Sequence, residues 1–216
     1  MSKISCKKNI IESVKYLIKR MIPFYMAYKK SKCSNISNQT FLGFVRFKLT
    51  GRCDNYGGYY PVHPNCTIAN MRKIYVGINS LVARPGCYLQ GAGTIRVGDY
   101  VHFAPNVGVL SANHDLYDQR KYNVAPIVIG DYSWIGMNSV ITAGVTLGTR
   151  TIVAAGAVVT KSFPDGFCVL AGVPAKVVKY LDKDKFVPWH SDYEYYGYIP
   201  KDKFELVRKK YLDIEL

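Results

Sequence analysis

Residues 129–160 read IGDYSWIGMNSVITAGVTLGTRTIVAAGAVVT, and this stretch decides the fold. Every sixth position holds a large aliphatic residue: Ile129, Ile135, Ile141, Leu147, Val153 and Val159. A period of six is neither the 3.6 of a helix nor the two of a half-exposed strand. It is typical of a hexapeptide β-helix, in which each six-residue unit forms one short strand and one corner. We expect the aliphatic side chains to point into the prism, and the glycine that follows three of them to supply the torsions of the corner.

The repeat extends towards the N-terminus and is interrupted once. It is faint before residue 76, clearer over 76–87 and 97–108, and amounts to roughly five coils of three units. A β-sandwich is disfavoured because no hairpin turn dipeptide separates the units of 129–160. Twenty residues separate Val109 from Ile129, against eighteen for one full coil. Insertions in repeat folds bulge outward and often bind ligands, so loop 110–128 is the predicted active-site loop.

The chain before the repeat, residues 1–61, is predicted to hold a helix and a junction. Residues 1–30 carry apolar side chains at helical spacing among lysines, and Pro23 should end this helix. The helix either packs on its own oligomer or lies on a membrane surface as a basic amphipathic helix. Its apolar runs are too short to span a bilayer. Residues 41–49, FLGFVRFKL, alternate as a strand.

The β-helix itself is assigned to residues 62–179, and residues 180–216 form a tail. The tract DYEYYGY at 192–198 serves either as packing or as a platform for a glycan. Residues 201–216 read as an amphipathic helix with Phe204 and Tyr211 on its apolar side. We expect this tail to cap the open end of the β-helix, because an uncovered edge would template aggregation.

The charge balance indicates an anionic partner. Lys and Arg number 29 against 15 Asp and Glu, a formal net charge of +14. The phosphates of a small molecule, an acidic glycan or a phospholipid surface would suit this excess, whereas no nucleic-acid motif accompanies it. The six cysteines show no paired spacing, so they read as small core residues in a reducing compartment and not as a metal site.

Residues 129–163, closing with AGVPAKVV at 171–178, resemble the hexapeptide-repeat acyltransferases. The resemblance covers residues 74–180 and is closest to the branch that O-acetylates sugars: maltose and galactoside acetyltransferases and bacterial capsule and exopolysaccharide O-acetyltransferases. It implies an all-β, left-handed parallel β-helix with short helical appendages at both ends. It also implies a homotrimer, a carbohydrate acceptor, acetyl-CoA as co-substrate and no metal. We expect a cytoplasmic protein, at the inner face of the membrane if the N-terminal helix binds lipid.

The resemblance also assigns the residues of the site. Acetyl transfer to a hydroxyl needs a base and donors for the oxyanion, and His114 stands where the sugar acetyltransferases carry their catalytic histidine. Residues implied or suggested for the acceptor are Asn113, Asp115, Tyr88 and Gln90. Tyr88 and Gln90 are suggested as replacement contacts, because the sugar-binding asparagine and aspartate of relatives are not clearly preserved in the tract 84–93. Residues implied for the donor are Trp134, Met137, Ala155, Thr160, Lys161, Lys176 and Lys179, with a backbone amide near Met137 as oxyanion donor.

Other functions remain as alternatives. Within the fold, the acceptor is either a sugar hydroxyl, the amine of an amino-sugar nucleotide, or serine. Serine acetyltransferases carry a larger helical N-terminal domain than about sixty residues provide. The γ-type carbonic anhydrases need an HxxxxH pair, which is absent here. A trimeric scaffold without activity is argued against by His114, Trp134 and Lys161.

Overall fold

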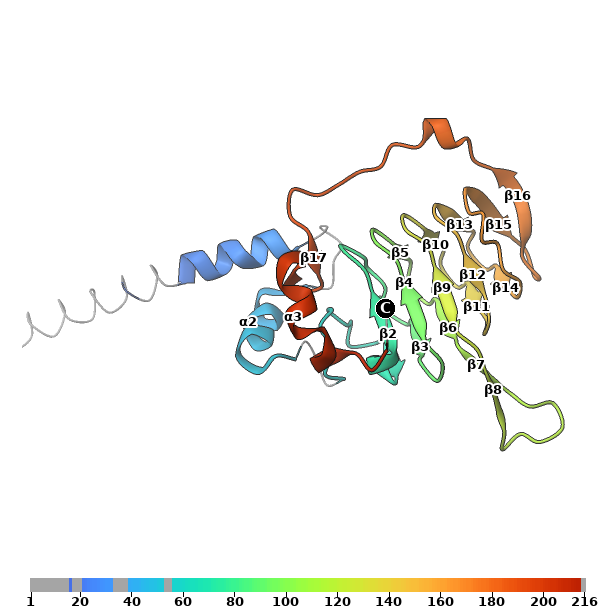
Figure 1. The fold of residues 1–216 in the computed structure, drawn as a ribbon, viewed down its shortest axis with the longest axis horizontal. Coiled ribbons are helices and arrows are strands. Elements are labelled where there is room, and N and C mark those ends of the chain that lie inside the picture. Colours follow the sequence, from blue (N-terminus) through green and yellow to red (C-terminus); the bar gives the residue numbers. More distant parts are fainter. Residues whose placement is uncertain (1–15, 17–20, 33–38, 53–55, 215–216) are drawn as a thin grey trace, which may run out of the picture.

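The computed structural model describes residues 16, 21–32, 39–52 and 56–214. Most of them form a parallel β-helix with three flat faces (Figure 1). Face 1 is made of β1 (Thr67–Ala69), β3 (Tyr88–Gln90), β6 (Gly108–Leu110), β11 (Val140–Ile141) and β14 (Val158–Val159). Face 2 is made of β2 (Ile74–Val76), β4 (Ile95–Val97), β9 (Ile127–Ile129) and β12 (Thr146–Leu147). Face 3 is made of β5 (His102–Phe103), β10 (Trp134–Ile135), β13 (Thr151–Val153), β15 (Cys168–Ala171) and β16 (Lys176–Tyr180). The chain thus turns three corners per coil, called corners 1–2, 2–3 and 3–1 after the faces they join.

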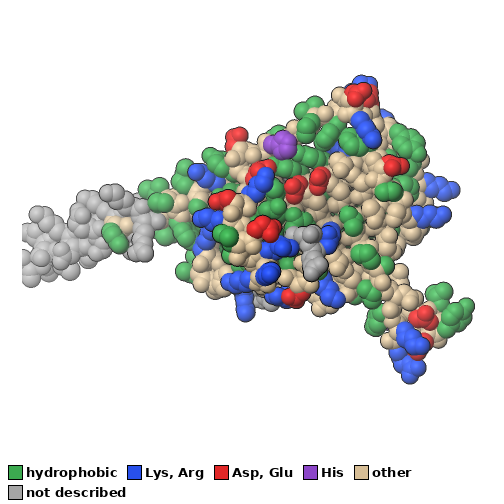
Figure 2. Space-filling view, viewed as in Figure 1, with side chains coloured by type: hydrophobic (Ala, Val, Ile, Leu, Met, Phe, Trp, Pro, Cys, Tyr) green, Lys and Arg blue, Asp and Glu red, His purple; other side chains and the backbone are tan. Residues whose placement is uncertain are grey.

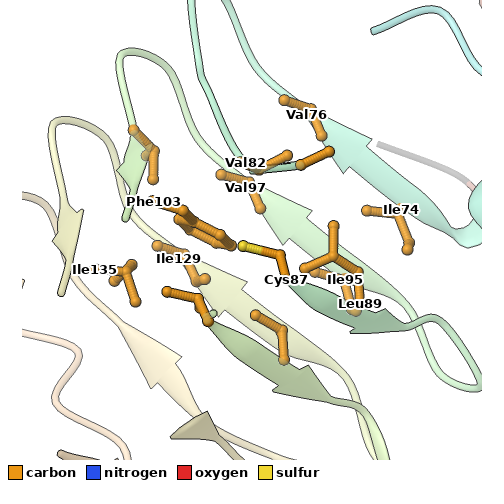
Figure 3. Close-up of a cluster of buried hydrophobic side chains, with 14 of the residues drawn as sticks. Ile74, Val76, Val82, Cys87, Leu89, Ile95, Val97, Phe103, Ile129 and Ile135 are labelled. Carbon is orange, nitrogen blue, oxygen red and sulfur yellow. The ribbon is translucent and has the colours of Figure 1, made fainter. Parts of the chain in front are cut away.

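The predicted inward residues form the core. All six aliphatic residues of the repeat in 129–160 are at most 1% exposed. Their strands pair in parallel with partners eighteen residues apart, as Trp134 with Ile152 and Ile141 with Val159. Figure 3 shows aliphatic side chains of successive coils stacked above one another inside the prism. The prediction of a hexapeptide β-helix is therefore confirmed.

The role predicted for the repeat glycines is wrong. Gly130, Gly136 and Gly148 do not have positive φ; the left-handed conformation falls two residues later, at Tyr132, Asn138 and Arg150. The glycines are required by close approach between coils instead. A Cβ on Gly148 would lie 2.1 Å from the carbonyl oxygen of Pro164. Even alanine at this position would force neighbouring backbones apart.

The insertion is a β-hairpin that projects from corner 1–2. It consists of β7 (Ala112–His114) and β8 (Tyr122–Val124), paired antiparallel. Val109 and Ile129 pair with Ile141 and Leu147, which are six residues apart in the next coil. The twenty residues from Val109 to Ile129 therefore take the place of a single six-residue step, and not of a full coil of eighteen residues. In the space-filling view hydrophobic side chains appear on this projecting lobe (Figure 2).

Two predictions for the N-terminal region are wrong. Residues 41–49 are not a strand but belong to α2 (Phe41–Thr50), which is capped by the Thr40 side chain and by Gly51 with φ of 69°. Alternation and helical spacing coincide here, and burial of Phe44 and Phe47 on one side selects the helix. Pro23 does not end the preceding helix, which covers 21–31. Phe24 and Tyr28 pack on α2 from this helix, with Phe24 5.3 Å from the Phe44 ring. Tyr16 is helical as well, and the other residues before Met21 lie outside the described residues.

The tail returns to the first coil. After β16 reverses direction along β15, residues 181–194 run back along the outside of the prism and contain η2 (Lys183–Lys185). They lead to β17 (Tyr195–Tyr196), β18 (Ile199–Pro200) and α3 (Lys201–Tyr211) (Figure 1). Phe204 lies 5.0 Å from the ring of Tyr59, and Tyr211 stacks on Phe47 of α2. The tail thus caps the end at which the prism begins. Tyr196 and Tyr198 serve packing, since Tyr196 stacks on Phe204 and Tyr198 is 2% exposed.

A short turn and three buried cysteines also belong to the described part of the chain. A 3-10 turn, η1 (Met71–Lys73), joins β1 to β2. Cys66, Cys87 and Cys168 are buried free thiols, as expected of small core residues. No helix among the described residues is long and apolar enough to cross a membrane.

Candidate active site

His114 lies on the projecting hairpin, and its ring orientation is fixed locally. Its Nδ1 is 2.6 Å from the backbone carbonyl of Gln119, and its ring lies 4.4 Å from that of Tyr122. A carbonyl only accepts hydrogen bonds, so Nδ1 carries a hydrogen, and in the neutral imidazole Nε2 then keeps its lone pair. The imidazole is exposed to solvent. This is the tautomer that a general base needs.

Asp115 closes the turn of the hairpin. One carboxylate oxygen accepts the backbone N–H groups of Tyr117 and Asp118, both at 3.0 Å. These two hydrogen bonds hold the pKa of Asp115 below its usual value. The carboxylate therefore has a structural task on the hairpin, and its predicted contact with the acceptor stays a prediction. Asn113 is exposed on β7 and pairs with Asn123 of β8.

Gln90 and Tyr88 lie on β3, one coil before the hairpin. The side-chain Oε1 of Gln90 accepts the backbone N–H of Ala112 at 3.1 Å, which ties face 1 to the root of β7. Ser111 adds a hydroxyl hydrogen bond to the Gln90 carbonyl. Tyr88 is 40% exposed at the start of the same strand. Gln90 thus supports the strand that carries His114, while acceptor binding by either residue remains predicted.

Three of the predicted donor residues line corner 3–1. Met137 and Ala155 occupy the same place on successive coils, because Trp134 and Ile152 are paired before them. Both are exposed, and among the described residues nothing accepts the N–H of either one. Lys176 begins β16 just beyond this corner, and Trp134 on the adjoining face is 56% exposed. The corner therefore offers two unpaired amides, an indole face and a cation, which suit a thioester arm and its phosphates.

The other donor residues lie elsewhere. Thr160 and Lys161 follow β14 on corner 1–2, the corner from which the hairpin projects two coils earlier. Lys179 lies near corner 2–3, in a hollow of about 500 Å³ that it shares with Arg150 and Phe186. Within one chain the structure thus brings His114, Asn113, Thr160 and Lys161 to one corner, and Met137, Ala155 and Lys176 to another. A full face of the prism separates the two groups.

Corner 2–3 carries a feature that the sequence analysis missed. On every coil its left-handed residue bears a side chain in place of the usual glycine: Asn79, Tyr100, Tyr132, Arg150 and Phe167. Bulky residues rarely adopt positive φ, so contacts must compensate. The Tyr100 and Tyr132 rings stack 5.1 Å apart, and the tail segment 181–194, hereafter the strap, packs on them. Phe186 of the strap lies 5.2 Å from Tyr132, and Trp189 lies 5.5 Å from Tyr100.

The strap encloses a groove over face 3. Its volume is about 560 Å³, and it runs between Trp134 and His102 on the face and Trp189 on the strap. Burial, followed by the nearby Arg84, lowers the pKa of His102, so this imidazole is neutral at pH 7. No group of three or more metal-ligating side chains occurs in the part of the chain that the structure describes.

Comparison with known proteins identifies the class. The family model described as bacterial transferase hexapeptide (six repeats) matches residues 126–161. Galactoside O-acetyltransferase of Escherichia coli K12 is 38% identical over 106 residues, which are 47% of this chain and 51% of that protein. A hexapeptide-repeat acetyltransferase of Vibrio cholerae, solved with acetyl-CoA, is 30% identical with a TM-score of 0.54, covering 58% of this chain and 70% of that one. A maltose O-acetyltransferase of Clostridium difficile 630 is 26% identical with a TM-score of 0.54, covering 78% and 89%.

The chain therefore belongs to the hexapeptide-repeat acetyltransferases. It spans about half the length of the curated relatives it matches.

Proposed function

We propose that this protein transfers the acetyl group of acetyl-CoA to a hydroxyl of a sugar, in a bacterial capsular polysaccharide or exopolysaccharide or its precursor. The observation that carries the proposal is the position and hydrogen bonding of His114. It stands in the insertion that interrupts the β-helix, exposed, with Nδ1 held by the Gln119 carbonyl at 2.6 Å. Relatives of known name include galactoside and maltose O-acetyltransferases, which favours a sugar as acceptor.

The chemistry follows from the tautomer. Nε2 of His114 takes the proton of the acceptor hydroxyl while its oxygen attacks the thioester carbonyl carbon. The carbonyl oxygen then carries negative charge, and the unpaired N–H of Met137 is placed to donate to it. As the C–S bond breaks, the imidazolium returns its proton to the departing sulfur. Ala155 and Lys176 hold the coenzyme at corner 3–1, and the Trp134 indole lies between its arm and the acceptor. Thr160 and Lys161 reach the coenzyme from the copy that supplies His114, and the lysines act as point charges on its phosphates. Lys179, near corner 2–3, lies apart from both groups.

The separation of the two corners favours an oligomeric site. His114 is a full face of the prism away from Met137 of its own chain, so the two cannot share a site. A second copy then supplies corner 3–1, with Met137, Ala155 and Lys176, hereafter the donor corner. The hairpin is suited to reach it, because Leu116 and Tyr117 are 91% and 97% exposed at its tip. Exposed apolar side chains of this kind mark contact surfaces. A cyclic trimer supplies a second copy's donor corner to each His114 and covers the exposed tip of each hairpin, with one site at each of its three interfaces.

The buried free thiols support a reducing, cytoplasmic location. Met21, Ile22 and Met26 are exposed on the helix over 21–31 and would be the residues through which a peripheral contact with the membrane is made.

Acetyl transfer can be tested with sugars of defined structure. The full-length protein is incubated with acetyl-CoA and a panel of neutral, acidic and amino sugars, and release of coenzyme A thiol is followed with a thiol reagent. We expect release that depends on the sugar, and a product whose acetyl group is removed by mild alkali, as an ester is and an amide is not. Alkali-stable product would establish N-acetylation instead. Thiol release that no sugar accelerates would reject the proposal.

A further inference from the structure

The groove between face 3 and the strap has the character of a ligand site. Its volume of about 560 Å³ falls in the range of small-molecule sites, about 300–1,000 Å³. It reaches from corner 2–3 across face 3 to corner 3–1, where Met137 and Ala155 lie. A molecule bound in it therefore lies beside the donor corner.

Two tryptophans form opposing parts of its wall. Trp134 is 56% exposed on β10, and Trp189 is 55% exposed on the strap. Both indole rings offer open apolar faces to the groove, and the C–H faces of a pyranose ring pack well on such surfaces. The strap holds Trp189 in place, because the backbone carbonyl of Trp189 accepts the Tyr132 hydroxyl at 3.2 Å.

The charged side chains that line the groove are all positive. Arg84 lines it from corner 3–1 and Arg150 from corner 2–3, so a guanidinium stands at each edge of face 3. The residues that line the groove include no aspartate or glutamate. Arg150 is oriented by its contact with the Phe186 ring, 5.6 Å from the centroid, and by the Tyr132 carbonyl. Arginine is the side chain best matched to a carboxylate, because its planar fork donates two parallel hydrogen bonds.

We propose that this groove binds a carboxylate-bearing sugar unit of the acceptor, so that the enzyme's acceptor is an acidic glycan. The inference rests on the proposed sugar acetyl transfer and adds the class of acceptor. The pyranose ring lies between Trp134 and Trp189, and Arg84 and Arg150 together attract its carboxylate. This contact places a neighbouring hydroxyl at the donor corner.

The test measures binding without acetyl-CoA, so that its outcome is independent of turnover. Isothermal titration calorimetry of the full-length protein uses two probes, tri-galacturonate and the neutral trisaccharide maltotriose. We expect tri-galacturonate to bind at least about tenfold more tightly, which is about 1.4 kcal/mol, because a hydrogen bond to a charged group is stronger than one to a neutral hydroxyl. Arg84→Gln should remove most of this preference while leaving maltotriose binding unchanged.

Two further variants keep the test decisive. Arg150→Gln repeats the charge removal at the other edge, so misfolding of one variant leaves the other informative. Lys209→Gln removes one exposed charge from α3 and should leave the preference intact. Equal binding of both trisaccharides, or an equal effect of Lys209→Gln, would overturn the proposal. Displacement of tri-galacturonate by coenzyme A alone would assign the groove to the donor and also overturn it. Loss of acetyl transfer with the preference retained would reject the proposed activity and not the site.

Discussion

His114→Ala should lower turnover by ~10²–10⁴-fold, because general-base catalysis typically contributes that much. Binding of acetyl-CoA should change little, since the donor residues lie on other coils. The melting temperature should also hold, because an exposed hairpin side chain leaves no core cavity. Steady-state kinetics with acetyl-CoA and the acceptor sugar measure the turnover of both proteins.

Gln119→Ala is the matched control for this prediction. The hydrogen bond from His114 goes to the backbone carbonyl of Gln119, so the variant keeps it and should retain wild-type turnover. A His114→Ala protein that is folded and keeps more than about a tenth of the wild-type rate would contradict the assignment.

Ile141→Asp should destabilise the protein by about 4 kcal/mol or more, because it places a carboxylate in the dry aliphatic stack. Ile141 is 0% exposed and has Val109 and Val159 as its ladder partners in adjacent coils. For a chain of this length each kcal/mol lowers the melting temperature by about 2–4 °C. Differential scanning calorimetry at fixed protein concentration would measure the shift.

Thr146→Asp controls for the added charge. Thr146 lies on β12 of the same coil, half-buried with its side chain outward, while Leu147 next to it points inward. We expect a change within about 0.5 kcal/mol, as for other surface substitutions. Comparable losses in both variants would mean that the inward and outward positions of the repeat are misassigned.

The β-helix was predictable because its period is local. The aliphatic positions from Ile129 to Val159 are spaced by the strand and corner alone, and each coil contacts mainly its neighbours. The helix Phe41–Thr50 was not predictable, because its apolar positions fit both strand alternation and helical spacing. Packing of Phe44 on Phe24 and Tyr198 selects the helix. Nor does spacing reveal that Gly148 is needed for close approach to Pro164 and not for its torsions.

The candidate site was predictable in part for the same reason. The insertion that carries His114 shows in the sequence as a break in the repeat. The strap does not show in the sequence, because the residues that contact Tyr132 and Tyr100 lie 54 and 89 positions further along the chain. Tyr100 and Tyr132 are thirty-two positions apart, and nothing in the sequence indicates that both have positive φ or that their rings stack. The separation of His114 from Met137 could not be predicted either, because it depends on the corner of the prism at which the fold places each residue.

The central claim is that His114 of one copy acts on the donor held by another copy, and mixed oligomers test it most directly. His114→Ala removes the base, and Ala155→Trp blocks the exposed donor corner; each protein alone should be nearly inactive. When the two are co-expressed in equal amounts, random mixing leaves about a quarter of the interfaces with an intact His114 facing an intact donor corner. We predict acetyl transfer at about a quarter of the wild-type rate per site. Activity no higher than the sum of the two separate variants would contradict the shared site.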